Sequence, residues 1–499
     1  MNESDYHPPA PSQEQPADRS RRDFLKKSAL STLALGSGAF MGTAANGQPR
    51  TTTEAITNPG EAKNVIFLVS DGMSAGTLTM ADLMLRRHHD RTSHWARLYE
   101  AYDEHPVRRG LMDMASRNSM VTGSGAASTS WGTGYRVNNG AVGVGPDGEE
   151  YQTILEVFRD AGKSTGLVTT TRITHATPAG FGTNVPERGM EDEIAEQYLD
   201  REYDVLRGGG SRHYDPDSRD DGRDLFAEHE DAGYEVVRTK DELAARDASG
   251  KILGTFYDTH VPYTTDHLHI DEYRETVPTL EEMTDAALQR LDQNQDGFIL
   301  QIEGGRVDHA AHGNDTAGLV YDQIAFDDAI GRVLEFVEGR DDTLVLVTTD
   351  HGNANPGVNG IGSGYGDSNP MFDAVADFER TNTWILSELD EDSTYREIKD
   401  RIERAWQLQI TRNEAFTLQQ ALRGDFEAVY RARSRPSAVL SAIQANYTAV
   451  NWIGSMHTSD YVELAALGPG SEAIGAFTRN TDLFDVMVEA AGVADYATG

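Results

Sequence analysis

The sequence predicts an α/β fold in which a doubly wound, mainly parallel central sheet carries helices on both faces, with loop and helical insertions. Continuous apolar runs, each followed by polar residues, alternate with helical stretches along the chain. Continuous rather than alternating apolar runs are typical of parallel strands that are covered on both faces. The alternation of strand and helix builds a sheet of this kind.

The central strands are predicted over residues 64–70, 162–171, 298–302 and 343–349, and helices over 74–89, 153–160, 279–291 and 316–338. Ligand sites in such sheets lie beyond the carboxyl ends of the strands. The residues at or just past these ends are Asp71, His175, Glu303 and Asp350. Four separate strands should therefore bring functional side chains to one edge of the sheet.

The amino-acid composition limits which molecules and metal sites the protein can bind. The 499 residues carry a formal net charge of −37, only 7 of the 44 basic residues are lysine, and there is no cysteine. We expect an acidic, halophilic surface, because concentrated salt screens the repulsion between like charges; an ordinary acidic protein is the alternative. This surface disfavours nucleic acids and anionic membranes. Without cysteine, any metal must be bound by histidine, carboxylate or hydroxyl groups.

Residues 1–46 are predicted to be a disordered N-terminus followed by an export signal. The run Ser20-Arg21-Arg22-Asp23-Phe24-Leu25-Lys26 precedes a mildly apolar stretch and small residues. This pattern resembles a twin-arginine signal, which directs export across the cytoplasmic membrane in folded form to the cell surface or beyond. A short amphipathic helix with a chance arginine pair is the alternative. The apolar stretch is too short and too glycine-rich for a permanent transmembrane anchor, and we identify no membrane-spanning segment elsewhere in the sequence.

The rest of the chain is predicted to be one large domain. We expect a linker over residues 47–62 and a single catalytic domain over residues 63–495. Within that domain, the acidic, helix-rich stretch at about 385–450 is expected to be an insertion.

Residues 303–312 hold a compact cluster of potential metal ligands, Glu303, Asp308 and His312. Asp308 and His312 are four residues apart, so a helix that starts near Asp308 would present both to one ion. The pair Gly304-Gly305 allows a sharp turn between strand and helix. Oxygen and nitrogen ligands suit zinc, and the remaining carboxylate suits a harder cation.

The run Asp292–Gly297 together with Glu303 matches the loop pattern of an EF-hand. Gly304-Gly305 stands where the exiting helix should begin, and no second motif of this kind is present. We therefore interpret the run as a polar turn that enters a strand. The non-enzymatic alternative is an acidic calcium-binding surface protein.

Ser124 lies among small residues in the segment 121–134. Small residues let a helix N-terminus approach an anion closely, and its free N–H groups stabilise negative charge. Tight packing of the helix is the alternative explanation. Beside dicationic metal sites, however, Ser124 becomes a candidate nucleophile, because a metal can lower the pKa of a serine hydroxyl.

Several motifs, in order and spacing, resemble the alkaline phosphatase family over about residues 62–475. They are Val65–Met73, the Ser124 segment, His175–Ala179, Glu303–His312, Thr349–Gly352 and Met456–Ser459. The resemblance implies an exported enzyme that hydrolyses phosphate monoesters with low selectivity through a phosphoserine intermediate. A phosphodiesterase or a sulfatase of the same superfamily is the alternative. Family members are commonly homodimers, so the resemblance also implies that this chain can pair with a second copy.

The resemblance further implies two Zn²⁺ and one Mg²⁺ per chain. One zinc ion would be bound by Asp308, His312 and His457. The other would be bound by Asp71, Asp350 and His351, beside Ser124. Magnesium would be bound by Asp71, Thr177 and Glu303. His175 and His309 are expected near the magnesium site, where they would support the ligands without binding the ion.

Arg188, ten residues after Pro178, is implied to bind two phosphate oxygens through its guanidinium group. Many family members have aspartate directly before the serine, where it helps to orient this arginine. This chain has Gly123, so we expect Arg188 to be freer or held by another acid. Ser124 is seven residues before Trp131, as in the family, which favours it as the nucleophile over Ser128 and Ser130.

Overall fold

The fold is that of a computed structural model, which describes residue 56 and residues 58–100, 106–246 and 249–498. The described residues belong to one compact unit, Arg50–Gly499. The predicted export signal lies outside the described residues.

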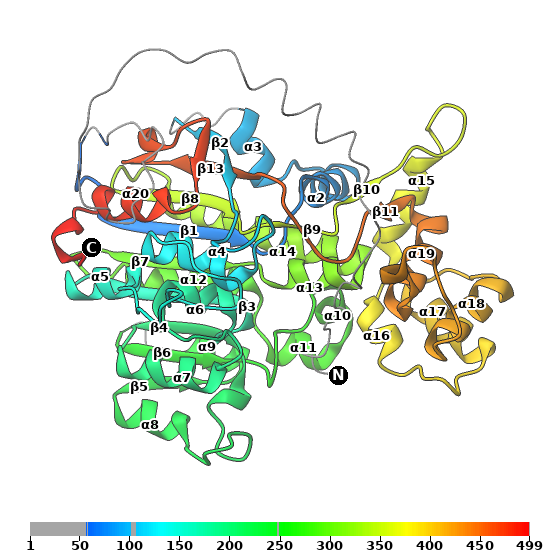
Figure 1. The fold of residues 1–499 in the computed structure, drawn as a ribbon, viewed down its shortest axis with the longest axis horizontal. Coiled ribbons are helices and arrows are strands. Elements are labelled where there is room, and N and C mark those ends of the chain that lie inside the picture. Colours follow the sequence, from blue (N-terminus) through cyan, green and yellow to red (C-terminus); the bar gives the residue numbers. More distant parts are fainter. Residues whose placement is uncertain (1–55, 57, 101–105, 247–248, 499) are drawn as a thin grey trace, which may run out of the picture. The chain divides into compact units, whose positions relative to one another are not determined.

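A ten-stranded sheet forms the centre of the described part of the chain (Figure 1). Its strands are β1 (Asn64–Ser70), β2 (Arg108–Asp113), β3 (Ser164–Arg172), β4 (Val205–Gly209), β5 (Tyr234–Val237), β6 (Lys251–Thr255), β7 (Phe298–Glu303), β8 (Thr343–Thr349), β13 (Val462–Leu467) and β14 (Phe477–Arg479). They lie in the order β14-β2-β13-β8-β1-β7-β3-β4-β6-β5. Only β13 runs antiparallel to its neighbours, β8 and β2. The predicted α/β fold with a mainly parallel sheet is confirmed.

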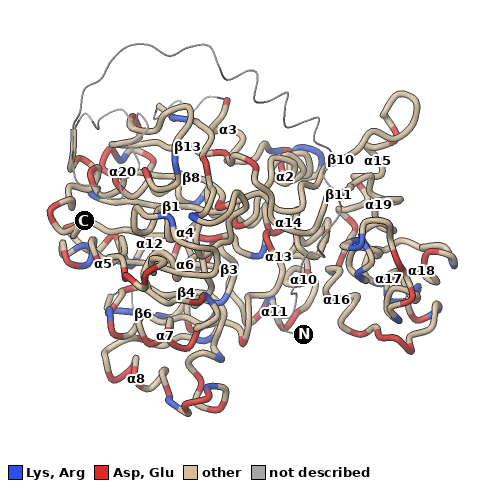
Figure 2. The backbone as a smooth tube through the Cα atoms, viewed as in Figure 1, with Lys and Arg blue, Asp and Glu red and all other residues tan. Residues whose placement is uncertain are grey.

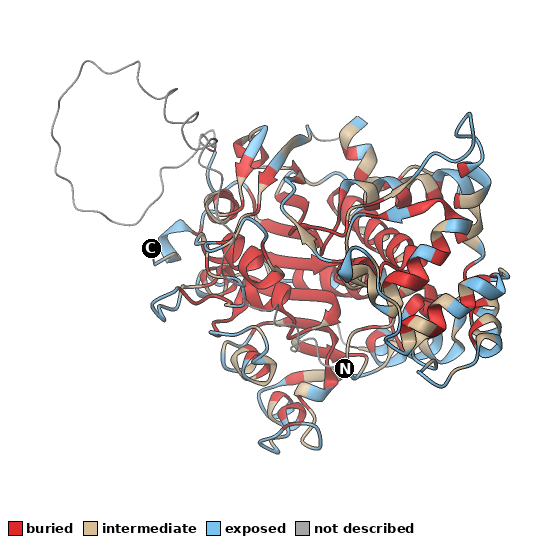
Figure 3. Cartoon of the chain, turned by 45° about the vertical axis from the view of Figure 1, so that its right-hand side comes forward, coloured by how far each residue is buried: buried red, intermediate tan, exposed pale blue. Residues whose placement is uncertain are grey.

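Helices cover both faces of the sheet because successive side chains of the buried strands point to opposite faces. Phe67 and Leu346 belong to one apolar core, whereas Ile66 and Val345 belong to the other. The first core is completed by α4 (Ser124–Thr133), α5 (Ile154–Asp160), α6 (Ala176–Gly182), α7 (Glu191–Asp200), α8 (Leu225–Asp231) and α20 (Asp482–Ala490). The second is completed by α3 (His94–Glu100), α9 (Lys240–Ala245), α12 (Leu280–Leu291) and α14 (Thr316–Val337). Figure 3 shows the strands buried between these two layers.

Helices α4 and α6 pack unusually closely. A Cβ atom added at Gly180 would lie 2.6 Å from Cβ of Ser128, and one at Gly132 would overlap the carbonyl oxygen of Gly180. Only glycine permits this approach. On its other side, Trp131 of α4 packs against Phe67 of β1, with ring centroids 5.0 Å apart. The small residues of segment 121–134 thus hold α4 tightly against both α6 and the sheet.

A third apolar core is formed by helices from several parts of the chain, from α2 near its start to α19. It includes α2 (Ala75–His88), α13 (Arg306–Gly313), α15 (Ser368–Asp373), α16 (Asn382–Leu386), α17 (Tyr395–Trp406), α18 (Arg412–Leu422) and α19 (Pro436–Thr448). Helices α17 and α18 each begin with a capping box, in which Thr394 or Thr411 exchanges hydrogen bonds with a glutamate three residues on. The expected acidic stretch is therefore helical.

Short elements complete the description. Two small antiparallel pairs join β9 (Gly352–Asn353) with β12 (His457–Thr458) and β10 (Pro356–Val358) with β11 (Val450–Trp452). The remaining helices are α10 (Thr264–His269), α11 (Asp271–Thr276) and the 3-10 turns Ser211–His213, Ala374–Asp377, Arg431–Ser434, Ser471–Ala473 and Ala494–Tyr496. Figure 2 shows Asp and Glu residues along helices and loops in all regions of the described part of the chain. No helix among the described residues has both the length and the apolar character needed to cross a membrane.

Candidate active site

The register of the parallel strands brings three carboxylates to one edge of the sheet. Val69 of β1 lies beside Glu303 of β7, and Ser70 lies beside Thr349 of β8. Asp71 and Asp350 follow directly, and all three carboxylates are fully buried. Glu303 is also in register with Thr169 of β3, so the segment after β3, which carries His175, reaches the same edge.

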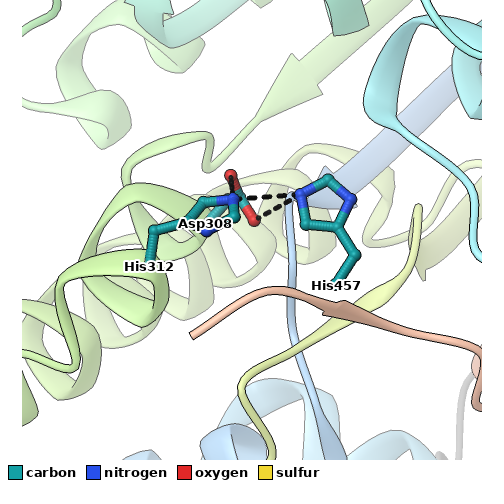
Figure 4. Close-up of side chains that lie close together, drawn as sticks. All are labelled: Asp308, His312 and His457. Carbon is teal, nitrogen blue, oxygen red and sulfur yellow. Dashed lines mark hydrogen bonds and ion pairs between the residues drawn. The ribbon is translucent and has the colours of Figure 1, made fainter. Parts of the chain in front are cut away.

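One group of potential ligands consists of Asp308, His312 and His457 (Figure 4). Helix α13 begins at Arg306, so Asp308 and His312 lie on one face of it. The pairing of β12 with β9 brings His457 to the same place. Nε2 of His312 lies 3.0 Å from Nε2 of His457, and the Asp308 carboxylate lies 3.3 and 3.6 Å from these two atoms. Two imidazole nitrogens and a carboxylate that meet at one point form a donor set suited to zinc.

Hydrogen bonds fix the direction of these three side chains. His312 donates from Nδ1 to the carbonyl oxygen of Ser455, and His457 donates from Nδ1 to that of Thr122, both at 2.8 Å. Each Nε2 then carries a lone pair that can bind a metal. Asn353 donates to the Asp308 carboxylate at 2.7 Å. The sequence did not single out Asn353, although its position two residues after His351 could have suggested it.

A second group consists of Asp71, Asp308 and His351. Nε2 of His351 lies 3.0 Å from the Asp350 carboxylate and 3.7 Å from that of Asp71. The structure therefore brings the expected set Asp71, Asp350 and His351 together. It also adds Asp308, which lies between this group and the first.

The third group contains Asp71 and Glu303, as the sequence led us to expect, but its third member is His175. Thr177 is nearby and donates to the Asp71 carboxylate at 3.4 Å. Thr169 and Thr171 both donate to one oxygen of Glu303. His175, expected only to support the ligands, is thus near enough to bind a metal itself.

The electrostatics of the edge fit divalent cations. Burial, followed by the charges of Asp350 and Asp308, raises the pKa of Asp71 well above its ordinary value. Burial also raises the pKa of Glu303 to about 7. One oxygen of Asp71 and one of Glu303 are buried and have no hydrogen-bond partner among the residues that the structure describes. Buried carboxylates this close together need positive charge between them to stay ionised.

The pKa of Asp308 is shifted in the opposite direction. Burial would raise it, but the neighbouring His312 and His457 outweigh burial and hold the pKa well below its ordinary value. In turn, burial and then the charge of His351 lower the pKa of His457 to about 4. His457 is therefore neutral at physiological pH, as a metal-binding imidazole must be.

Ser124 is the first residue of α4 and is buried. Its Oγ lies 3.4 Å from Nε2 of His351. The hydroxyl groups of the other serines in this helix already donate hydrogen bonds to the backbone. Ser128 donates to the carbonyl oxygen of Thr177, and Ser130 donates to that of Ala126. The first turn of α4 has N–H groups without partners in the helix, which favours a negative charge at Ser124. The geometry therefore favours Ser124 as the nucleophile.

Arg188 is held by a histidine. Its backbone N–H donates to Gly140, and its Nη2 lies 2.8 Å from Nε2 of His175. In the described part of the chain no carboxylate pairs with it. Burial, followed by the charges of Arg188 and Arg172, lowers the pKa of His175 to about 3. The guanidinium group of Arg188 therefore contacts an imidazole, and not another acid, in the described part of the chain.

His175 belongs to a cluster of buried histidines. The ring of His309 lies 5.4 Å from that of His175, and the ring of His260 lies 5.5 Å from it. Arg306 contacts Nδ1 of His309 at 2.8 Å. His260 was not predicted from the sequence, although it follows β6 closely and functional residues are expected just past the ends of parallel strands.

The run that matches an EF-hand forms a turn. Asp292 makes a bidentate ion pair with Arg340, at 2.7 and 2.6 Å. Asn294 donates to Gly162 and accepts from the N–H of Asp296. Glu303 lies at the far end of β7, with the other buried carboxylates of the edge. The ligands of a calcium loop are therefore not assembled.

Comparison with known proteins agrees with this arrangement. The family model described as alkaline phosphatase matches residues 62–493. Alkaline phosphatase 4 of Bacillus subtilis strain 168 is 30% identical over 435 residues, which are 86% of this chain and 88% of that protein. Alkaline phosphatase 3 of the same organism is 30% identical over 482 residues, 93% of this chain and 96% of that protein. The crystal structure of Thermus thermophilus alkaline phosphatase superposes with a TM-score of 0.81 at 32% identity and covers 89% of this chain and 96% of that chain. The chain therefore belongs to the alkaline phosphatase family.

Proposed function

We propose that this protein hydrolyses phosphate monoesters through a phosphoserine on Ser124, at a site for two zinc ions and one magnesium ion. Family membership gives phosphatase activity, and the ester class, the metals and the intermediate are the proposal. One observation supports it above the others: Oγ of Ser124 lies 3.4 Å from Nε2 of His351. That contact places the serine directly beside the buried carboxylate–histidine groups.

The residues proposed for each ion combine the three groups with the family resemblance, which adds Asp350 and Thr177. Asp308, His312 and His457 would hold one zinc ion, and Asp71, Asp350 and His351 the other. Asp71, Thr177 and Glu303 would hold magnesium, whose oxygen preference suits them. When bound, two such ions stabilise the attacking and leaving oxygens of an in-line displacement and lower the pKa of bound hydroxyl groups.

The chain's own groups supply the remaining steps. Oγ of Ser124 attacks phosphorus, the bond from phosphorus to the ester oxygen breaks, and the alcohol leaves with a proton. Water then attacks the phosphoserine, inorganic phosphate leaves, and the serine hydroxyl is restored. The first turn of α4 faces the negative charge with its N–H groups. Arg188 would bind two non-reacting phosphate oxygens.

Replacement of the serine tests the proposal. Ser124→Ala should lower monoester turnover by at least about a thousandfold, because a nucleophile is not replaced by its neighbours, while the zinc content stays unchanged. Ser130→Ala is the matched control, since its hydroxyl donates only to the carbonyl oxygen of Ala126. Near wild-type turnover by Ser124→Ala would assign the attack to another group.

The ester class needs a separate measurement. We expect 4-nitrophenyl phosphate to react faster than bis(4-nitrophenyl) phosphate or 4-nitrophenyl sulfate, because Arg188 and two cations suit a phosphate with two negative charges. A faster reaction with the diester or the sulfate would replace the monoesterase proposal by the corresponding alternative.

Export in folded form and adaptation to high salt are proposed from the sequence. The Arg21-Arg22 pair within residues 1–46 supports the first, and the net charge of −37 the second. Fusion of residues 1–46 to a folded reporter protein tests export. The reporter should leave the cytoplasm, and Arg21→Lys combined with Arg22→Lys should retain it there.

A further inference from the structure

We propose that Arg207 binds a small inorganic anion, chloride, inside the protein, through the edge of its guanidinium group that Nε and Nη2 form. Arg207 belongs to β4, and its side chain reaches the backbone of α12. The site involves none of the residues of the candidate active site. A chloride ion there would supply negative charge that the neighbouring residues do not, and it would make the stability of the fold depend on chloride.

Arg207 is buried in an apolar layer. Val205 and Arg207 share one face of the sheet, because alternate residues of a strand point the same way, and Val205 belongs to the second apolar core. On β6, Gly254 is in register with Arg207. A Cβ atom added at Gly254 would lie 2.7 Å from the ring of Phe256, a member of the same core. The side chain of Arg207 is 0% exposed, so its charge lies among apolar groups, away from solvent.

The guanidinium group of Arg207 uses only one of its edges within the described part of the chain. Nη1 donates to the carbonyl oxygen of Met283 at 2.9 Å. Nε and Nη2 are buried and have no hydrogen-bond partner among the described residues. These two nitrogens form the fork of parallel N–H groups that binds a carboxylate or another anion at two points. Buried donors without an acceptor are costly, so the fork requires an acceptor.

Other arginines of this chain show what the same edge binds. In Arg87, Nε and Nη2 donate to the two carboxylate oxygens of Asp373, at 2.5 and 2.6 Å. In the buried Arg219 they donate to the two oxygens of Asp221, at 2.9 and 2.5 Å. Arg207 offers the same two donors, but no carboxylate of the described residues accepts from them. The donor geometry is therefore that of an anion-binding fork.

Positive charge gathers around Arg207. Arg246 donates to the carbonyl oxygen of Ala286, one helical turn along α12 from Met283, and its own Nε is also a buried donor without a partner among the described residues. Burial, followed by the charges of Arg246 and Arg290, lowers the pKa of Arg207 well below its ordinary value. Because a guanidinium group stays protonated in proteins, its charge is a cost to the folded state that an anion would offset.

The nearby acids do not provide this charge. Glu235 and Asp285 act on the pKa of Arg207 in the opposite direction, but less than burial and the two arginines do. Asp285 is already paired with Arg332, at 2.6 Å. Glu235 makes no ion pair with Arg207 in the ranges that the structure describes. The counter-charge is therefore expected from outside the chain.

The enclosure determines the class of anion. Phosphate and sulfate have four oxygens and up to two charges, so burying either would require many more donors than this site offers. A single-atom, monovalent anion can accept from Nε and Nη2 at once and leaves no further polar atom to satisfy. Chloride has these properties, and bromide is its closest substitute.

The test measures the stability of the metal-loaded protein against chloride at constant ionic strength. Unfolding by urea is followed from about 10 mM to about 1 M sodium chloride, with sodium gluconate making up the difference. Constant ionic strength removes general screening, and gluconate is too large for the enclosed site. Once the site is filled, each tenfold increase in chloride should lower the equilibrium constant for unfolding about tenfold.

Two substitutions locate the effect. Arg207→Met removes the fork, so its unfolding should not depend on chloride. Because a buried charge is also removed, this variant should be at least as stable as the wild type in low chloride and less stable in high chloride. Arg219→Met is the matched control, because this buried arginine already pairs with Asp221 through the same edge. It should keep the chloride dependence of the wild type.

A second measurement shows the anion directly in the wild type. Bromide has the charge of chloride and scatters X-rays anomalously. Crystals grown from sodium bromide should therefore show an anomalous peak within hydrogen-bonding distance of Nε and Nη2 of Arg207.

Unfolding of the wild type that is independent of chloride would overturn the proposal and leave water or a carboxylate such as Glu235 beside the fork. A dependence that persists in Arg207→Met, or crystals without a bromide peak beside Arg207, would place any bound anion elsewhere and also overturn it. Both wild-type measurements decide the proposal even if Arg207→Met does not fold. Neither uses turnover, so their outcome is independent of the proposed phosphatase reaction.

Discussion

Gly72, directly after Asp71, should tolerate no side chain. It has φ of +70°, and a Cβ atom there would lie 2.9 Å from Cα and Cβ of Asp308 and overlap its carboxylate. An L-residue in the left-handed region costs about 1–2 kcal/mol, and overpacking of a tight interior costs about 1–3 kcal/mol more. We therefore expect Gly72→Ala to lower the free energy of unfolding by about 2–5 kcal/mol, a large share of a typical total.

Gly148→Ala provides the matched control. Gly148 has φ of +80° and nothing within 4 Å of the added Cβ atom, so it incurs only the backbone cost of about 1–2 kcal/mol. Denaturant unfolding of the chelated proteins measures both values, and their difference isolates the clash with Asp308. Because Asp308 must move, zinc affinity of Gly72→Ala should also fall at least about tenfold. Equal unfolding free energies in the two variants, with zinc affinity unchanged, would refute the reasoning.

The remaining predictions concern the support of Asp308 and a buried acid. Asn353→Ala removes the 2.7 Å hydrogen bond to Asp308 and should weaken zinc binding about 10–100-fold in a competition titration. Asn359→Ala is the control, because its side chain donates only to the carbonyl oxygen of Gly357, and it should leave zinc binding unchanged. An equal loss of zinc affinity in the two variants would contradict a role of Asn353 in supporting Asp308. Burial raises the pKa of Asp322 to about 7 from 3.8. Its contribution to stability is therefore complete at acid pH and is lost as the pH rises from about 4 to 7. Asp322→Asn should remove up to about 1.4 kcal/mol per pH unit of this decline, measured by denaturant unfolding at a series of pH values. An unchanged slope would show that Asp322 does not titrate in this range.

Much of the fold was readable from the sequence because the central strands are buried on both faces. The runs at 64–70 and 343–349 coincide with β1 and β8, and helix α12 begins at Leu280, directly after its predicted start at Thr279. The short strands were not singled out. β14 has three residues, and in β2 only Met112 is buried. A strand with so few buried residues shows no clear alternation of apolar side chains, so the sequence pattern cannot identify it.

The candidate site, like the fold, could be predicted from the sequence only in part. Residues at strand ends and the spacing of Asp308 and His312 could be predicted, because parallel strands share a carboxyl edge and a helix repeats every three to four residues. The contact between Arg188 and His175, and the hydrogen bond of Asn353 to Asp308, could not. They join segments whose distance depends on how elements pack, which no local pattern records.

The sequence by itself therefore determined the class of fold, the edge at which the site lies and the types of side chain that meet there. Only the tertiary structure decided which of these side chains form each group. Asp308 lies between two groups, His175 stands where only a supporting role was expected, and an imidazole contacts Arg188, which the sequence left either freer or held by another acid. The physical reason is that local residue order sets which atoms a segment offers, whereas packing of distant segments sets which atoms come within bonding distance. Glu303 and Asp308, five residues apart around Gly304-Gly305, show what the sequence determines, because both the turn and the division of these two side chains between different ions were predicted from it.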